Sequence, residues 1–129
     1  MKKLFLFFLI SISISTVMGQ SAEKDAISEA IKAGDPQKIA FYFLPSVDLT
    51  VETAEDVYSK DQAEMIIRRF FEDHVTKGFS LKHEGKSKLE DHYYIGTLTT
   101  DKGDYRLTFF LKKSEDGFRI KQMRIENTP

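Results

Sequence analysis

Alternating apolar and polar residues over the C-terminal half of the chain, residues 79–125, constrain the fold more than any other feature. Successive side chains of a strand point to opposite faces, so an apolar residue at every second position indicates a strand with one buried face. Three such segments are separated by short polar turns, which favours an antiparallel meander. The predicted inward residues are Phe79, Leu81 and His83, then Tyr94, Gly96 and Leu98, then Tyr105, Leu107, Phe109 and Leu111.

The turns predict how these strands pair. A two-residue loop at residues 102–103 would place Leu98 opposite Leu107 and Tyr94 opposite Leu111. All four side chains would then lie on one side of the sheet, as their apolar character requires.

The last strand contains a change of phase. A loop at residues 114–117 leads into it, and its apolar residues Ile120 and Met123 are three positions apart instead of two. One extra residue must be absorbed, and a β-bulge near residues 121–122 does this while placing Met123 opposite Phe109. Because bulges bend sheets, the sequence predicts a strongly curved sheet.

The N-terminal half shows helical spacing instead. Apolar residues at helical intervals predict one helix over residues 21–33 and a second from Pro36 to just before Pro45, followed by a strand over residues 47–51. The segment Ser59-Lys60-Asp61-Gln62 is a capping box, from which a long amphipathic helix should run to about His74 and cover the sheet. N-terminal helices packed on a strongly bent antiparallel sheet define an α+β domain.

The first 19 residues have the layout of a cleavable signal peptide. Two lysines precede an apolar and hydroxylic stretch, residues 4–16, which ends in a small-x-small pattern at residues 17–19. An uncleaved membrane anchor is the alternative, but a spanning helix needs roughly 20 apolar residues and this stretch is shorter and broken by serines. We therefore expect export, to the periplasm or out of the cell, and one domain over residues 20–129 with no membrane attachment after cleavage.

The composition of the predicted mature domain excludes several functions. Only two lysines are lost with the signal peptide, so 17 of the 19 basic residues remain, scattered among 20 acidic ones. This mild acidity argues against nucleic acid or anionic lipid as a partner. The absence of cysteine excludes disulfides and zinc–thiolate sites, and we expect no cofactor because no phosphate-binding loop or hydrolase motif is present.

The three histidines do not suggest a metal site. His74, His83 and His92 are predicted on a helix end, a strand and a loop, and only His83 has an inward phase. Asp73 beside His74 resembles an acid–base pair, but neighbours on a helix point about 100° apart, which favours a solvated helix end.

Several short motifs carry a family resemblance. They are Tyr58-Ser59, Gln62-Ala63-Glu64, Phe70-Phe71, His83-x-Gly85-x-Ser87, Tyr94-Ile95-Gly96-x-Leu98, Gly103-x-Tyr105-Arg106 and Arg124-Ile125-Glu126. Together they resemble a bacterial family of short exported proteins known only as a domain of unknown function. The order of elements also resembles the cystatin-like cone fold of nuclear transport factor 2 and ketosteroid isomerase. Because the family is known only as a domain of unknown function, the resemblance implies this fold and export but no activity. Isomerase chemistry also needs inward aspartates, and none is among the predicted inward residues.

Four side chains are the candidate pocket residues, namely Tyr42, His83, Tyr94 and Tyr105. At the mouth of the cone, their phenol and imidazole groups could bind a small apolar or aromatic ligand. The alternative is a filled core with no room for a ligand.

The opposite face of the sheet is expected to be mostly polar. Ile95 and Phe110 would pair at its centre, beside Arg106, as a small apolar island. This island is either ordinary surface or the middle of a sheet-to-sheet homodimer contact.

Three functional hypotheses follow. The first is an exported, non-enzymatic module that binds a ligand or an exported protein. The second is a small-molecule enzyme of the ketosteroid-isomerase-like or dehydratase-like type, with His83 as acid or base and Tyr94 or Tyr105 as hydrogen-bond donor. The third is an accessory domain that docks on a larger exported partner.

Overall fold

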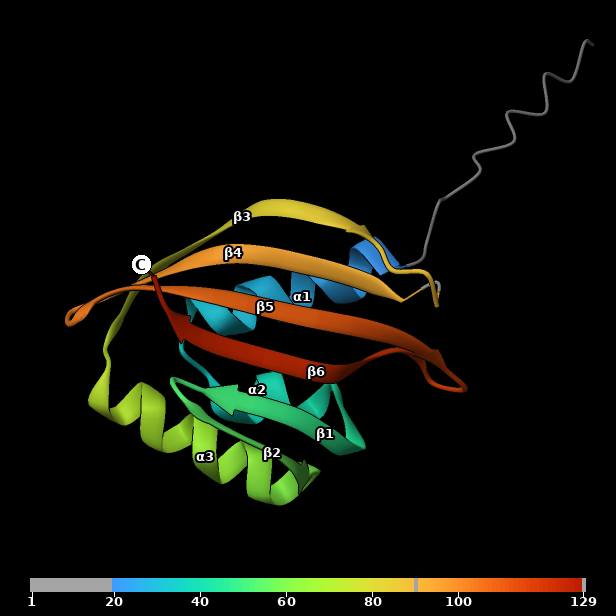
Figure 1. Cartoon of the computed structure of the whole chain (residues 1–129), viewed down its shortest axis with the longest axis horizontal. Coiled ribbons are helices and arrows are strands. Elements are labelled where there is room, and N and C mark those ends of the chain that lie inside the picture. Colours follow the sequence, from blue (N-terminus) through green and yellow to red (C-terminus); the bar gives the residue numbers. More distant parts are fainter. Residues whose placement is uncertain (1–19, 90, 129) are drawn as a thin grey trace, which may run out of the picture.

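The computed structural model of the chain describes residues 20–89 and 91–128, so the predicted signal peptide lies outside the described residues. In this part of the chain, three helices and six strands follow one another along the sequence (Figure 1). They are α1 (Gln20–Lys32), α2 (Pro36–Phe41), β1 (Phe43–Val51), β2 (Ala54–Ser59), α3 (Lys60–Asp73), β3 (Thr76–Lys86), β4 (His92–Thr100), β5 (Gly103–Ser114) and β6 (Gly117–Asn127).

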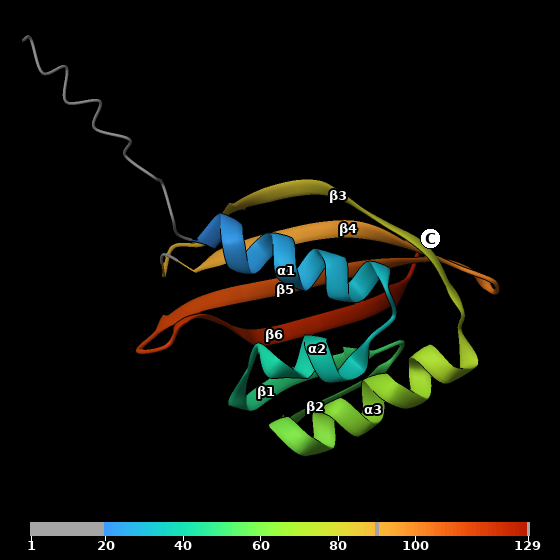
Figure 2. The ribbon, with the colours of Figure 1, turned by 180° about the vertical axis from the view of Figure 1, so that it is seen from behind.

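The strands form one curved, open sheet in the order β2-β1-β6-β5-β4-β3. Neighbouring strands are antiparallel except β1 and β6, which are parallel. All the described helices lie on one face of this sheet, and Figure 2 shows them in front of it. The opposite face, turned toward the viewer in Figure 1, is not covered by any helix of the described chain. The predicted α+β class with a bent sheet is therefore confirmed.

The predicted bulge in the last strand is confirmed. Met123 lies opposite Phe109 and Ile120 opposite Leu111, with a register shift between them that leaves Lys121 as the extra residue. Because the shift restores the phase, Ile120 and Met123 are both fully buried.

The pairing of β4 with β5 differs from the prediction by two residues. Thr100 pairs with Gly103, so the loop consists of residues 101–102, and Leu98 faces Tyr105 instead of Leu107. The Thr100 hydroxyl closes this turn by donating to the Gly103 carbonyl (2.8 Å) and accepting from the Lys102 amide (3.1 Å). A shift of two keeps every side chain on its predicted face.

The helices follow the predicted signals, with one difference in length. Ser59 caps α3, with the Gln62 amide donating to its hydroxyl and its own amide donating to the Gln62 side chain. Helix α2 ends at Phe41, earlier than expected, and β1 then contains Pro45. The proline is tolerated because β1 and β6 are irregularly paired between Phe43 and Asp48.

The core lies between the helices and the concave face of the sheet. Its members include Ile27 and Ile31 of α1, Ile67 of α3, and Leu107 and Phe109 of β5, all of them without exposed surface. Among the described residues, no helix is both long and apolar enough to cross a membrane.

Candidate functional site

The interior of the cone is filled by side chains. Tyr94, a predicted pocket residue, is only 2% exposed, and its ring stacks on Phe109 at a centroid distance of 5.1 Å. Leu98 and Met123 beside them have no exposed surface. Of the two alternatives for the concave face, the structure has the filled core. The four predicted pocket residues occupy separate environments.

His83 does not point inward, contrary to the prediction. A register shift between Leu81 and His83 leaves Lys82 unpaired, so His83 lies opposite Ile95 on the outer face and is exposed. Glu84 takes the position opposite Tyr94 instead and pairs with Lys24 of α1 (3.6 Å). The sequence could not reveal this change of phase because residues 82–84 are all polar.

Tyr94 is a buried phenol near acidic side chains. Burial, and then the carboxylates of Glu84, Asp25 and Glu23, raise the pKa of Tyr94 above its ordinary value of 10.0. The Lys24 ammonium lies 5.8 Å from the centre of its ring. The phenol therefore stays protonated at neutral pH, as a hydrogen-bond donor with no basic character.

Tyr105 belongs to a different cluster, at the end of α3. Its hydroxyl lies 2.9 Å from Nε2 of His74, and the His74 ring stacks on Phe70 at 4.1 Å. The His74 Nδ1 lies 2.9 Å from the Phe70 carbonyl oxygen, which can only accept, so Nδ1 carries the proton. In the neutral ring, Nε2 then accepts the hydrogen bond that the Tyr105 hydroxyl donates.

A carboxylate completes this cluster. Glu52, in the turn between β1 and β2, places Oε1 3.9 Å from Nε2 of His74. Burial, and then this carboxylate, raise the pKa of Tyr105. Sequence analysis predicted a solvated helix end at Asp73 and His74, whereas the His74 side chain is only 12% exposed. Its partners are 22 and 31 residues away, and no local pattern indicates them.

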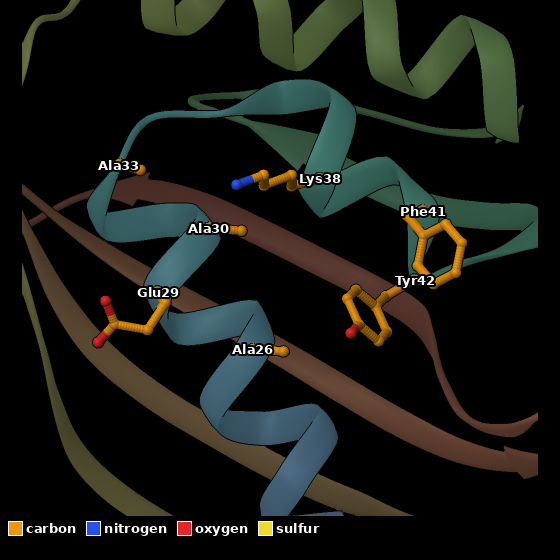
Figure 3. Close-up of a pocket in the computed structure, with 7 residues that line it drawn as sticks. All are labelled: Ala26, Glu29, Ala30, Ala33, Lys38, Phe41 and Tyr42. Carbon is orange, nitrogen blue, oxygen red and sulfur yellow. The ribbon is translucent and has the colours of Figure 1, made fainter.

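The clearest hollow near a predicted site residue is a groove between α1 and α2, with a volume of about 450 Å³ (Figure 3). Ala26 and Ala30 of α1, with Ala33 in the turn that follows it, form its floor, and Tyr42 closes one end of it. Tyr42 thus lines a groove between two helices, whereas the prediction placed it at the mouth of the cone. Alanines leave room between helices that larger side chains would fill.

Charged and aromatic groups surround the groove. Glu29 and Lys38 supply one acidic and one basic group at its edge, and Phe41 is 60% exposed beside Tyr42. The Arg119 guanidinium lies 5.6 Å from the centre of each of these two rings. These cation–π contacts hold the aromatic wall in place.

The outer face of the sheet carries the predicted interface residues, with altered pairing. Ile95 lies opposite Thr108, and Phe110 lies opposite Tyr93, with ring centres 5.9 Å apart. The two predicted residues are therefore not direct partners, because the β4–β5 register is shifted by two. Arg106 lies on the same face, 3.7 Å from Glu126.

The described residues contain no group of three or more histidine or acidic side chains arranged to hold a metal ion. His74 is in the aromatic cluster, His83 is on the outer face, and His92 contacts Phe118 edge-to-face at 5.4 Å. The three histidines thus lie in three separate places.

The fold is that of the nuclear-transport-factor-2-like proteins. A proposed dehydratase of that family from Streptomyces avermitilis has a TM-score of 0.60 with 12% identity, covering 85% of this chain and 94% of its own. At such identity the likeness concerns the fold alone. No functionally curated protein matches the chain.

The sequence identifies the family within this fold. Residues 24–126 match the domain of unknown function DUF4783, and the chain belongs to this family. A DUF4783 family protein from Bacteroides fragilis is 30% identical, covering 80% of this chain and 96% of its own, with a TM-score of 0.75. One from Bacteroides uniformis is also 30% identical, covering 81% and 96%, with a TM-score of 0.76.

Proposed function

We propose that this protein is an exported, non-enzymatic binding module whose ligand site is the groove between α1 and α2. The supporting observation is the contrast between the filled cone and the open groove. Concave sites with an apolar floor and a few polar groups are the usual form of small-molecule sites. The groove has such a floor and offers the Tyr42 hydroxyl and the Lys38 ammonium as polar groups.

The ligand that fits this groove is a small apolar or aromatic molecule with one or two polar substituents. Its body would lie on the alanines of the floor and against the ring of Phe41, which is 60% exposed. The same ring could equally receive an apolar side chain of an exported protein partner.

The enzyme alternative has less support. It required His83 and a donor tyrosine to face a common cavity, but His83 lies on the outer face while Tyr94 is in the core. The Tyr105–His74–Glu52 cluster has acid–base groups, yet Tyr105 is only 7% exposed and its hydroxyl is already bonded to His74. A reacting group needs access to its substrate.

Binding in the groove can be tested with N-phenyl-1-naphthylamine, a neutral fluorescent probe that reports apolar sites. Ala26→Leu adds bulk to the floor and should weaken binding by about tenfold or more. Ala22→Leu makes the same change one turn away, at an exposed position outside the lining, and should leave binding unchanged. Equal probe binding by both variants would refute the groove as the site.

Export has a separate test. The intact mass of the protein recovered from the cell envelope should correspond to a chain that begins at Gln20. Native mass spectrometry of the same sample would detect a retained ligand and the oligomeric state. A full-length mass, or recovery only from the cytoplasm, would contradict export.

A homodimer through the outer sheet face is a second candidate. The observation that favours it is a group of half-buried side chains on this uncovered face, namely Tyr93 and Ile95 of β4 and Phe110 of the neighbouring strand β5. Isolated exposed apolar residues are common, but neighbouring ones on two adjacent strands form a patch.

A further inference from the structure

A second hollow lies at the end of the sheet remote from the 101–102 turn. There the β3–β4 connection and the β5–β6 turn lie at the same end of the molecule (right-hand end in Figure 1). We call it the mouth pocket, and it has a volume of about 310 Å³. Its lining includes Lys86, His92, Lys112, Lys113 and Phe118, from four different strands.

The mouth pocket gathers positive charge that is not neutralised within the described chain. No ion pair joins a described residue to Lys86, Lys112 or Lys113. The one described carboxylate in the lining, that of Asp91, is already paired with Lys121 and is mostly buried.

The mouth pocket also has an apolar wall. The Phe118 ring contacts His92 edge-to-face at 5.4 Å, and Leu89 beside it is 79% exposed. Two hydrogen bonds hold the connection that carries Leu89: the Ser87 amide donates to the Asp91 carbonyl (2.8 Å), and the Leu89 amide donates to the Ser87 hydroxyl (3.3 Å). Leu89 is thus kept at the surface beside the lysines.

We propose that the mouth pocket binds a small organic anion with an apolar body. Its carboxylate would be held by the ammonium groups of Lys86 and Lys113, which lie on the same face of the sheet as Phe118, and its aliphatic or aromatic part would lie on Phe118 and Leu89. Charge-assisted hydrogen bonds to a carboxylate are stronger than neutral ones, and a partly enclosed site strengthens them further. This site is separate from the groove between α1 and α2 and does not depend on it.

The test uses sodium octanoate as the probe, with calorimetry for affinity and amide chemical shifts for location. Octanoate should bind and shift the signals of His92 and Phe118, while neutral octanamide should bind about tenfold more weakly or worse. The double variant Lys86→Gln/Lys113→Gln should lose at least about tenfold in affinity for octanoate. Lys77→Gln/Lys102→Gln removes the same charge from exposed positions of the chain outside the mouth pocket and should bind as the unaltered protein does.

Several results would overturn the proposal. Equal affinity of the two double variants for octanoate, or equal binding of octanoate and octanamide, would show that the lysines do not bind the carboxylate. Inorganic phosphate that binds as tightly as octanoate would show that the apolar body of the ligand contributes nothing. Binding to phosphatidylglycerol vesicles without binding to free octanoate would assign the lysines to a lipid surface instead. Binding of the neutral naphthylamine probe in the groove should persist in both double variants, so this proposal and that for the groove can fail independently.

Discussion

The hydroxyl of Tyr105 bonds to an imidazole whose position is set by α3, and this contact joins sequence positions 31 residues apart. His74 is held from three sides, by the Phe70 carbonyl, the Phe70 ring and the Tyr105 hydroxyl. The sequence predicts that Tyr105 faces inward and that His74 ends a helix. It does not predict their contact, because the two side chains meet only when α3 packs against the first residues of β5.

The raised pKa values of Tyr94 and Tyr105 predict a loss of stability at alkaline pH. The folded protein keeps these phenol protons above the ordinary pKa of 10.0, where the unfolded chain has released them. The unfolded state then binds fewer protons, so the free energy of unfolding falls as pH rises through that value. Urea unfolding between neutral pH and pH values above this pKa measures the fall.

Phenylalanine variants separate the two tyrosines. Tyr105→Phe should reduce the alkaline loss and cost about 1–3 kcal/mol at neutral pH, because Nε2 of His74 loses its donor. Tyr94→Phe should reduce the alkaline loss without that cost, since its hydroxyl forms no hydrogen bond with another described residue. An alkaline slope that is unchanged in both variants would contradict this account.

Glu52 has a strained backbone that its surroundings maintain. Its φ is 60°, in the left-handed region, and its amide donates to the Ile125 carbonyl (2.7 Å). Glu52→Gly and Glu52→Ala remove the same carboxylate, but only glycine relieves the strain. We expect the glycine variant to be more stable than the alanine variant by about 1 kcal/mol in urea unfolding. Equal stability of the two would show that the turn tolerates this conformation without strain.

Helices and strands with a capping motif or a regular apolar spacing can be predicted from the sequence. Elements that form only because a neighbouring strand pairs with them cannot. The capping box predicts where α3 begins, and the change of phase in β6 predicts its bulge, because each signal lies within a few residues. Strand β2 carries Ala54, Glu55 and Asp56, which have low strand propensity, and it pairs as a strand because β1 offers it an edge. The bulge at Lys82 cannot be predicted either, because the residues around it are polar and show no change in apolar spacing.

Gly96 shows how β3 and β4 approach one another. A Cβ atom at this position would lie 2.7 Å from the Phe79 ring and 2.7 Å from the Ser80 carbonyl oxygen. Gly96→Ala should therefore destabilise the fold by about 1–3 kcal/mol, because the backbone atom cannot move aside as a side chain could. Gly78→Ala on the same strand pair meets nothing within 4 Å and should change stability by less than about 0.5 kcal/mol. Similar losses in both would mean that strand flexibility, and not crowding, decides the effect.

For the molecule as a whole, a filled cone leaves the surface as the place where a ligand or partner can bind. The phase change in the last strand predicts the curvature of the sheet, and the order of elements resembles the cone fold, but neither shows whether the cone is hollow. That depends on whether inward rings such as Tyr94 and Phe109 stack on each other, which they do. The groove between α1 and α2 depends on the packing of two helices, which the periodicity of each helix alone does not specify.

The outer face of the sheet is where the proposed assembly can be tested. If two copies pack through it, Phe110 lies near the centre of the contact, and Phe110→Asp would bury an unpaired charge there. Light scattering should then report a dimer for the unaltered domain and a monomer for this variant. Met65→Asp introduces the same charge at an exposed position on α3, on the opposite side of the sheet, and should remain dimeric. An unaltered domain that is monomeric at all accessible concentrations would eliminate the dimer and leave Tyr93, Ile95 and Phe110 as a surface for a different protein.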